Sequence, residues 1–233
     1  MRRIALDTET TGLEPSLGHR IIEIAAVELV NRQLTGNRFH RYVNPGRASD
    51  EGALQVHGLS EEFLRDKPGF HEIAAELLDF IGGAELIIHN APFDTGFLDY
   101  ELSLLDMKPL AEYCGGIVDT LRIARDLHPG KKNSLDALCE RYQIDRSRRT
   151  RHGALIDTEL LAQVYLAMTR GQDSLNMAIE PASPVAAQLN VGGALDLVVI
   201  TAGADELAEH EKQLTDIDRA SGGACLWRRL QGA

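Results

Sequence analysis

The order of the apolar segments constrains the fold of this 233-residue chain more than any other feature. Three strand-like runs come first, and the segment NRQLTGN between the second and third has the residues of a hairpin turn. Later strands alternate with segments of helical periodicity. The expected strands are residues 2–7, 20–30, 37–43, 85–90 and 116–119, and the expected helices are 49–66, 70–81, 92–105, two that start at Thr120 and Ser134, and 154–169. This order indicates an α/β domain on a mixed sheet, with active residues at strand ends and adjoining helices.

The composition changes after Gly171. Residues 180–194 mix Pro, Ala, Ser, Gly and Gln without periodicity, which is typical of a flexible linker. Beyond the linker we expect a strand at 195–201, a helix at 204–220 and a short apolar terminus at 225–230. About 40 residues are too few for an independent core, so this tail is expected to need a partner surface. The predicted domains are residues 1–175, a junction with the linker at 176–194, and a C-terminal segment at 195–233.

The net charge of −11 argues against a protein that grips duplex nucleic acid over a wide basic face, because affinity for phosphates comes from Lys and Arg. A nucleic-acid enzyme with this charge would need metal ions at its site, or a partner to hold the substrate. Three cysteines without C-x-x-C spacing favour free thiols over a disulfide framework or a zinc site. No apolar stretch approaches the roughly 20 residues that span a bilayer, and no signal-peptide pattern is present, so we expect the cytoplasm.

Two carboxylates stand at the end of the first apolar run, in the segment IALDTETTGL. Side chains alternate along a strand, so Asp7 and Glu9 point the same way, and each would hinder the ionisation of the other. A cation between them would remove this conflict. Taken alone, the pair also fits a strand end with a helix cap or a solvated charge.

Two further acidic residues stand where such a sheet would bring them near this pair. Asp94 follows a buried strand and lies in the first turn of the next helix, where a carboxylate is also favoured by the helix dipole. Asp157 lies on a late helix, where a solvated position is the alternative. His152 precedes Asp157 by five residues, a rotation of about 140° on a helix, so we place it ahead of that helix rather than on its face.

The order D-x-E, then an Asp after a strand, then H-x-x-x-x-D resembles the DEDDh family of 3′–5′ exonucleases. The similarity is carried by the segments LDTETTGL, VHGL, IIHNAPFD, NSLDAL and RHGALIDTELLAQVYL, from residue 3 to about residue 170. HPGKKNSLDALCERY, VYLAMT and GGACLWR extend it toward members that proofread for bacterial replicative polymerases. The resemblance implies a ribonuclease H-like sheet of five strands, the second antiparallel, flanked by helices.

The family pattern also implies the chemistry. It places four carboxylates around two divalent cations, Mg²⁺ or Mn²⁺, with Asp7, Glu9 and Asp157 as direct ligands and Asp94 as the fourth acid. It makes His152 the general base in a two-metal-ion hydrolysis that releases 5′-mononucleotides. Thr8, Thr10 and His57 resemble residues that line the terminal nucleotide, and Asn90 resembles a supporting residue of that site.

Two other groups of residues are open to more than one interpretation. Asp119 could be a fifth metal ligand, but we favour a cap on the helix that follows. The basic cluster before His152 either contacts substrate phosphates or is simply solvated; its members are Arg146, Arg148, Arg149 and Arg151.

The resemblance implies two protein partners. The tail from residue 195 onwards, with Trp227, is expected to bind the catalytic (alpha) subunit of a replicative polymerase. Residues 172–177 resemble a sliding-clamp (beta) binding motif with Gln172, Leu175 and Met177 as its contacts. The leading hypothesis is therefore a proofreading exonuclease that acts on single-stranded or frayed 3′ ends. The alternatives are a stand-alone DEDDh nuclease that trims RNA 3′ ends, which would not need the tail, and a non-catalytic polymerase adaptor.

Overall fold

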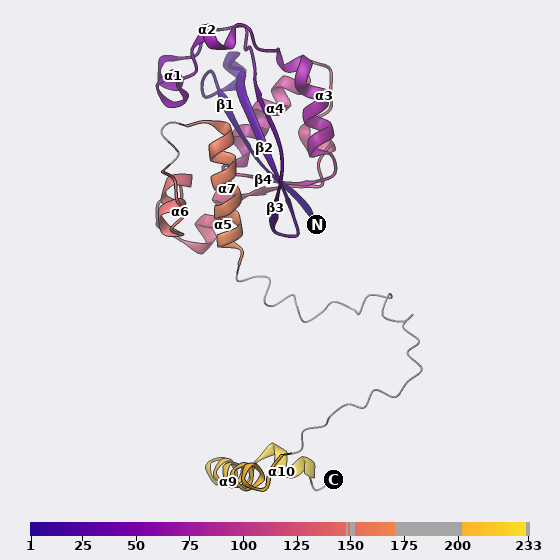
Figure 1. The fold of residues 1–233 in the computed structure, drawn as a ribbon, viewed down its shortest axis with the longest axis vertical. Coiled ribbons are helices and arrows are strands. Elements are labelled where there is room, and N and C mark those ends of the chain that lie inside the picture. Colours follow the sequence, from indigo (N-terminus) through magenta and orange to yellow (C-terminus); the bar gives the residue numbers. More distant parts are fainter. Residues whose placement is uncertain (148, 150–151, 171–201, 232–233) are drawn as a thin grey trace, which may run out of the picture. The chain divides into compact units, whose positions relative to one another are not determined.

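The computed structural model describes residues 1–147, 149, 152–170 and 202–231 of the chain. The chain forms two compact units, Met1–Glu180 and Pro181–Ala233, and each is described by itself (Figure 1). The predicted linker at 180–194, the predicted strand at 195–201 and the predicted domain boundaries at 175 and 194 lie outside the described residues. These remain predictions.

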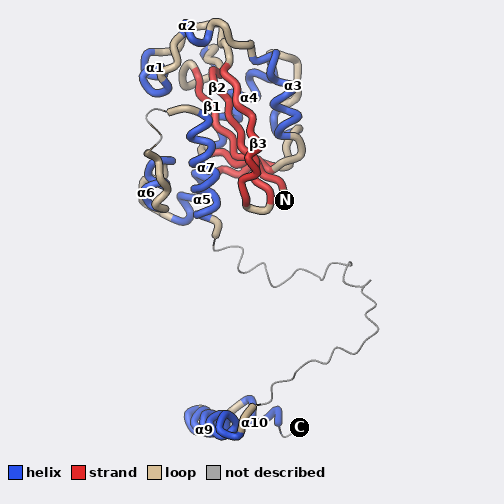
Figure 2. Tube along the Cα trace, in the orientation of Figure 1, coloured by secondary structure: helices blue, strands red, loops and turns tan. Residues whose placement is uncertain are grey.

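The first unit is built on a five-stranded mixed sheet (Figure 2). Its strands are β1 (Arg2–Thr10), β2 (Ile21–Val30), β3 (Gln33–Tyr42), β4 (Glu85–Ile88) and β5 (Gly116–Asp119). They lie in the order β3-β2-β1-β4-β5. β2 runs antiparallel to both of its neighbours, and β4 pairs in parallel with β1 and β5. The predicted fold class, with an antiparallel second strand, is confirmed.

The hairpin between β2 and β3 is tighter than the sequence pattern predicts. Its loop is only Asn31 and Arg32, both with positive φ of 48° and 63°. This conformation matches the twist of two antiparallel strands in a two-residue turn, so β3 begins at Gln33 rather than at residue 37. β1 is likewise longer than predicted and reaches Thr10, which keeps Asp7 and Glu9 inside the strand.

Helices cover both faces of the sheet. The predicted helical region at 49–66 is two helices, α1 (Glu51–His57) and α2 (Glu61–Leu64), because Gly58 takes a left-handed conformation and Ser60 caps a new helix. The other helices of the first unit are α3 (Phe70–Ile81), α4 (Ala91–Ser103), α5 (Thr120–Leu127), α6 (Leu135–Arg141) and α7 (Ala154–Met168), with 3₁₀ turns η1 (Pro15–Leu17) and η2 (Leu110–Glu112).

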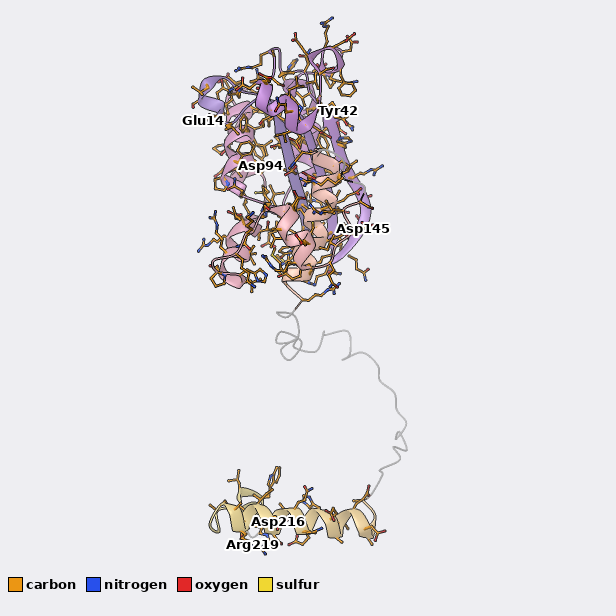
Figure 3. All side chains as sticks on the ribbon, turned by 90° about the vertical axis from the view of Figure 1, so that its left-hand side faces the viewer. Glu14, Tyr42, Asp94, Asp145, Asp216 and Arg219 are labelled. Atoms are coloured by element: carbon orange, nitrogen blue, oxygen red, sulfur yellow. The ribbon has the colours of Figure 1, made fainter. Side chains whose placement is uncertain are left out.

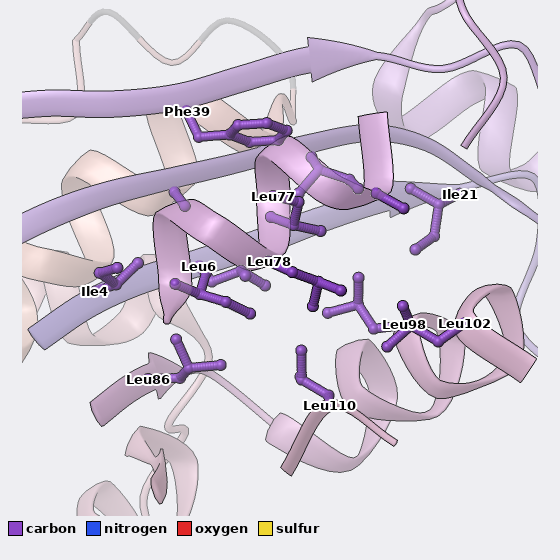
Figure 4. Close-up of a cluster of buried hydrophobic side chains, with 14 of the residues drawn as sticks. Ile4, Leu6, Ile21, Phe39, Leu77, Leu78, Leu86, Leu98, Leu102 and Leu110 are labelled. Carbon is purple, nitrogen blue, oxygen red and sulfur yellow. The ribbon is translucent and has the colours of Figure 1, made fainter. Parts of the chain in front are cut away.

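The core has a layer on each face of the sheet. On one face, β1 residues Ile4 and Leu6 pack with α3 and α4, through side chains such as Leu77 and Leu98 (Figure 4). On the other face, Ala5 and Ile87 pack against α7. Burial of these side chains on both faces fixes β1 at the centre of the sheet, so its polar end is held in place by the whole core.

The second unit contains two described helices, α9 (Ala204–Ala220) and α10 (Leu226–Gln231). The predicted helix at 204–220 is confirmed. Among the described residues of the second unit, Leu214 and Cys225 are buried, and α9 ends before a turn at Gly222 and Gly223, both with positive φ. Within the described parts of the chain, none of the helices is long and apolar enough to cross a membrane. All three cysteines are free thiols.

Candidate active site

Three elements bring the predicted acidic residues together at one end of β1. Asp7 and Glu9 are two residues apart on the strand, and both are partly exposed, whereas Thr8 and Thr10 between and beyond them are buried. This alternation follows from the strand geometry. The two carboxylates therefore point to the same face of the sheet, as the sequence predicts.

Asp94 is anchored to this end of β1 by two hydrogen bonds. The backbone N–H and the hydroxyl of Thr8 both donate to Asp94 Oδ1, at 3.0 and 2.7 Å. Asp94 lies in the first turn of α4, which begins after Asn90 in a left-handed conformation, and its side chain is buried amid the first unit (Figure 3). Thr8, which the sequence analysis assigned to the terminal nucleotide, thus also holds the fourth carboxylate.

The start of α7 and the residues just before it supply Asp157 and His152. Asp157 lies in the first turn of α7 and is buried, so the solvated alternative is wrong. His152 precedes the helix, which begins after Gly153, and its imidazole is half exposed. His152 Nδ1 lies 3.3 Å from Asp157 Oδ2. One ligand atom from each of Glu9, His152 and Asp157 lies within 4.8 Å of the others, so these atoms could hold one metal ion.

The pKa values show that burial, and for Asp7 and Glu9 also the neighbouring carboxylates, disfavours the ionised forms. Desolvation, and then the charge of Asp94, raises the pKa of Asp7 well above its usual range. Desolvation and the charge of Asp157 raise the pKa of Glu9 to about 8. Burial raises the pKa of Asp94 to about 7, although the hydrogen bonds from Thr8 favour its ionised form. Carboxylate oxygens and one imidazole are donors that suit a divalent cation, and its charge would relieve this conflict.

Arg149 is the residue whose position differs most from the sequence interpretation. It is not solvated: its side chain is only 7% exposed. Its Nε donates to Asp157 Oδ1 at 2.5 Å and one terminal nitrogen donates to Asp157 Oδ2 at 2.6 Å, while the other donates to Asp136. A planar guanidinium matches a carboxylate in this two-bonded geometry. Of the other cluster members, Arg146 also contacts Asp136, and Arg148 and Arg151 lie outside the described residues.

Successive residues of β1 line two cavities. One, of about 780 Å³, is lined by Asp7, His152 and Asp157, by the predicted supporting residue Asn90, and by α5 and the loop before α6. The other, of about 360 Å³, is mostly apolar and is lined by residues that include Thr8, Glu9, Thr10, Leu13, Val56, His57 and Phe93. The predicted nucleotide-lining residues therefore gather around one cavity.

His57 brings a buried donor to the smaller cavity. Its Nδ1 accepts a hydrogen bond from the backbone N–H of Leu59, at 2.9 Å, which leaves the proton of a neutral imidazole on Nε2. Nε2 is buried and has no partner within the described structure. A buried donor without a partner is costly unless a ligand supplies one.

Sequence reasoning missed several residues beside the site. Glu23 lies opposite Glu9 in the β1–β2 register, is buried, and is 2.7 Å from His40 Nε2. An acid inside the apolar run IIEIAAVELV was the available signal, because a buried charge needs a local reason. Asp136, the second partner of Arg149, gave no comparable signal. Asp119 caps α5 by accepting from the N–H of Leu121 at 2.9 Å, as expected.

Known exonuclease sequences resemble this chain over most of its length. A family of exonucleases matches residues 4–165. The DNA polymerase III epsilon subunit of Escherichia coli K12 is 52% identical over 238 residues, which cover 97% of both chains. That of Haemophilus influenzae is 46% identical and covers 99% of this chain and 96% of its own. This chain belongs to the exonuclease family of the DNA polymerase III epsilon subunits. The predicted 3′–5′ exonuclease of the proofreading type is confirmed.

Solved exonuclease structures have the same fold. Exonuclease X, solved in complex with 5′ overhanging duplex DNA, is 24% identical with a TM-score of 0.58, and the match covers 73% of this chain and 93% of that one. Escherichia coli exonuclease I, in a zinc-bound complex with single-stranded DNA, is 20% identical with a TM-score of 0.65, over 76% of this chain and 42% of that one. The epsilon family implies metal-dependent catalysis, and the acidic cluster is present in this chain.

Proposed function

We propose that this epsilon-family exonuclease removes mispaired 3′-terminal nucleotides as 5′-mononucleotides, with Asp7, Glu9, Asp94, Asp157 and His152 as its catalytic residues. The observation that supports this most directly is the gathering of these side chains from β1, α4 and the start of α7 at one end of β1: Glu9, His152 and Asp157 offer ligand atoms close together, Asp7 lines a cavity with His152 and Asp157, and Asp94 is hydrogen-bonded to Thr8. A lone acidic residue has many structural roles, whereas four carboxylates and an imidazole at one strand end have few.

Asp7, Glu9 and Asp157 would hold two divalent cations, Mg²⁺ or Mn²⁺, because their oxygens are the donors that these ions prefer. When bound, such ions supply Lewis-acid activation of water and stabilisation of negative charge on the phosphate. Asp94 would stay hydrogen-bonded to Thr8 and would add its negative charge to the site without being one of these three ligands. The half-exposed position of His152 leaves its imidazole accessible to water from the larger cavity.

His152 would act as the general base. The neutral imidazole takes a proton from the attacking water, the water oxygen forms a bond to phosphorus, and the bond from phosphorus to the 3′ oxygen of the preceding nucleotide breaks. That oxygen takes up a proton, so the products are a 5′-mononucleotide and a strand with a new 3′-hydroxyl. The reaction adds one water across one phosphodiester and needs no other reactant.

The smaller cavity would receive the terminal nucleoside. Its apolar lining suits a base and sugar, and the Nε2–H of His57 offers a hydrogen bond to a polar atom of the ligand. A paired terminal nucleotide cannot enter unless it leaves its stack. A mismatched end unpairs at lower cost, so selection for mispaired ends would follow from access rather than from base recognition.

Asp7→Asn tests the assignment of the site. With Mg²⁺ present, we expect at least about a hundredfold lower rate on single-stranded DNA labelled at its 5′ end, because positioned cation and charge stabilisation are lost. Glu14→Gln is the matched control, since Glu14 is an exposed acid that lines neither of the two cavities (Figure 3). The label also reports polarity: shortening from the 3′ end supports the proposal. Near-normal hydrolysis by Asp7→Asn would contradict it, and faster hydrolysis of RNA than of DNA by the parent chain would favour the RNA-trimming alternative.

The second unit would bind the polymerase III catalytic (alpha) subunit. Among the described residues of this unit, the large apolar side chains are mostly exposed, and the exposed ones are Leu207, Ile217, Leu226 and Trp227. Exposed aromatic and aliphatic side chains on a small unit favour a binding surface. The clamp-binding residues Gln172, Leu175 and Met177 lie outside the described residues, so contact with the sliding clamp stays a prediction.

A further inference from the structure

The larger cavity has a basic wall in addition to the catalytic carboxylates. Its lining includes Asp7 and Asp157, and also Arg125 of α5 and Lys131 of the loop between α5 and α6, which form this basic wall. Both basic side chains are exposed, and neither forms an ion pair with any residue that the structure describes. In a chain of net charge −11, unpaired basic groups inside the catalytic cleft call for a specific explanation.

The loop that carries Lys131 is held in place by its own contacts. Gly130 supplies a left-handed turn, with φ of 73°. Asn133 is buried and donates to the carbonyl of His128, at 3.3 Å. Arg141 of α6 donates to the side chain of Asn133, at 3.1 Å, and to the carbonyl of Lys132, at 2.8 Å. These bonds fix the backbone on either side of Lys131, so its ammonium is presented to the cavity from a defined position.

The arrangement of the two cavities assigns a direction to the substrate. If the terminal nucleoside occupies the smaller, mostly apolar cavity, the scissile phosphate lies at the carboxylates of β1, and the rest of the strand must leave on the other side. The larger cavity opens there and has about twice the volume of the smaller one, 780 against 360 Å³. Strand phosphates in it would pass the basic wall.

We infer that Arg125 and Lys131 bind backbone phosphates of the substrate strand on the 5′ side of the scissile bond. This inference rests on the proposed exonuclease function and adds substrate-positioning residues to it. Such contacts carry no base information, which suits an enzyme that must accept any sequence. They also explain how an acidic chain retains a single strand: the grip is local, while the rest of the surface stays negative.

The test compares Arg125→Ala, Lys131→Ala and the double variant with Arg122→Ala and Lys132→Ala. The two controls remove the same charges from the same helix and the same loop, at exposed positions that do not line the cavity. Two substrates are used: a single-stranded oligonucleotide, and an aryl ester of a 5′-mononucleotide, which has the scissile phosphodiester but no upstream phosphates. Binding of the oligonucleotide is also measured by fluorescence anisotropy with Ca²⁺ in place of Mg²⁺.

We expect the double variant to lose about tenfold in kcat/KM on the oligonucleotide relative to the aryl ester, and about tenfold in oligonucleotide binding. The slope of log kcat/KM against log salt is negative, and in the double variant it should become less steep by about 1.4. Each phosphate contact to a single strand contributes about 0.7 to the steepness of the slope. The controls should leave the ratio of the two substrates unchanged. Equal anisotropy titrations for the double variant and the parent chain would overturn the inference, as would the same loss in the controls. If the parent chain hydrolyses neither substrate, the proposed function fails, and the anisotropy comparison still decides the role of the two basic residues.

Discussion

At the scale of single residues, the ion pair of Arg149 with Asp157 determines how the site behaves before cations bind. The guanidinium occupies both carboxylate oxygens of Asp157 and also contacts Nδ1 of His152, at 2.7 Å, and its remaining partner, Asp136, belongs to a different helix. A buried carboxylate needs such a counter-charge, because the neighbouring acids otherwise repel it. A cation that uses Asp157 as a ligand must therefore compete with Arg149 for the same oxygens, and Asp136 keeps a partner for the displaced guanidinium.

Arg149→Met should separate these two effects. We expect the cation-free protein to unfold more easily, by on the order of 3 kcal/mol, because Asp157 loses its partner. We expect Ca²⁺ to bind several-fold more tightly, since no competing cation remains, as measured by calorimetric titration. Arg146→Met is the control, because Arg146 contacts Asp136 but not Asp157. Weaker Ca²⁺ binding by Arg149→Met than by Arg146→Met would show that Arg149 supports the cation instead of competing with it.

The raised carboxylate pKa values predict how stability depends on pH. In the folded protein the pKa is about 8 for Glu9 and about 7 for Asp94, both above the values of the unfolded chain. The folded state thus binds more protons, so this contribution to stability is present at low pH and is lost as the pH rises through 7 to 8. With EDTA, the urea midpoint followed by circular dichroism should be lower near pH 8.5 than near pH 6. Excess Ca²⁺ should restore it. A midpoint that is equal at both pH values would contradict the electrostatic account of the site.

The sequence could predict which acidic residues gather at the end of β1 but not their immediate partners, and the reason is physical. Asp7, Glu9, Asp94 and Asp157 interrupt apolar or helical patterns at positions where a fold alone does not need a charge. Arg149 sits among four arginines within six residues, and periodicity cannot tell which of them turns inward. That choice depends on the separation between α6 and α7, which only the packed structure sets.

At the scale of elements, an ion pair with a buried carboxylate joins α4 to the residue just before β2. Arg20 donates to both carboxylate oxygens of Glu101, at 2.8 and 2.6 Å, and Glu101 is only 1% exposed. Arg20 also exchanges backbone and side-chain hydrogen bonds with Thr11, just beyond β1. The pair therefore ties the helix that carries Asp94 to the end of the strand that carries Asp7 and Glu9.

Arg20→Met should be far more costly than the loss of an exposed pair. It leaves the carboxylate of Glu101 buried without its partner, and we expect a loss of about 3 kcal/mol in the free energy of unfolding. Arg38→Met breaks a contact of 3.9 Å to Glu159, with Arg38 60% exposed, and should cost less than about 1 kcal/mol. Urea unfolding of both variants measures the difference. Equal losses would mean that the contact with Glu101 contributes no more than a surface pair.

Most elements were predictable because their apolar spacing is decided locally, as in α3, whose predicted and observed bounds agree. The hairpin boundary was not, because Asn31 and Arg32 accept positive φ only in the context of two paired strands. The division of the region at 49–66 into two helices likewise depends on the left-handed conformation of Gly58.

At the scale of the whole molecule, the two compact units contain different aromatic residues. All five tyrosines, at positions 42, 100, 113, 142 and 165, belong to the first unit, and the single tryptophan, Trp227, belongs to the second.

The two units also differ in how much apolar surface they bury. The first unit has a core on both faces of its sheet, whereas in the second the described buried residues are Leu214 and Cys225. We expect a unit whose described residues bury so little apolar surface to gain much of its stability from a partner.

Trp227 provides a direct measurement of that binding. Its side chain is 64% exposed on α10. Because it is the single tryptophan, protein produced with 5-fluorotryptophan carries one fluorine signal, at this position. The polymerase catalytic subunit is not labelled, so it adds no fluorine signal of its own. We expect this signal to shift and broaden when the polymerase subunit is added, because an exposed aromatic anchor becomes buried. Trp227→Ala should weaken polymerase binding by about thirtyfold, the effect of losing a contact worth about 2 kcal/mol. Arg219→Ala, on the exposed polar side of α9, should leave the affinity unchanged. An unaltered fluorine signal together with equal affinities for both variants would place the polymerase contact away from Trp227, and the apolar end of the second unit would then need another partner.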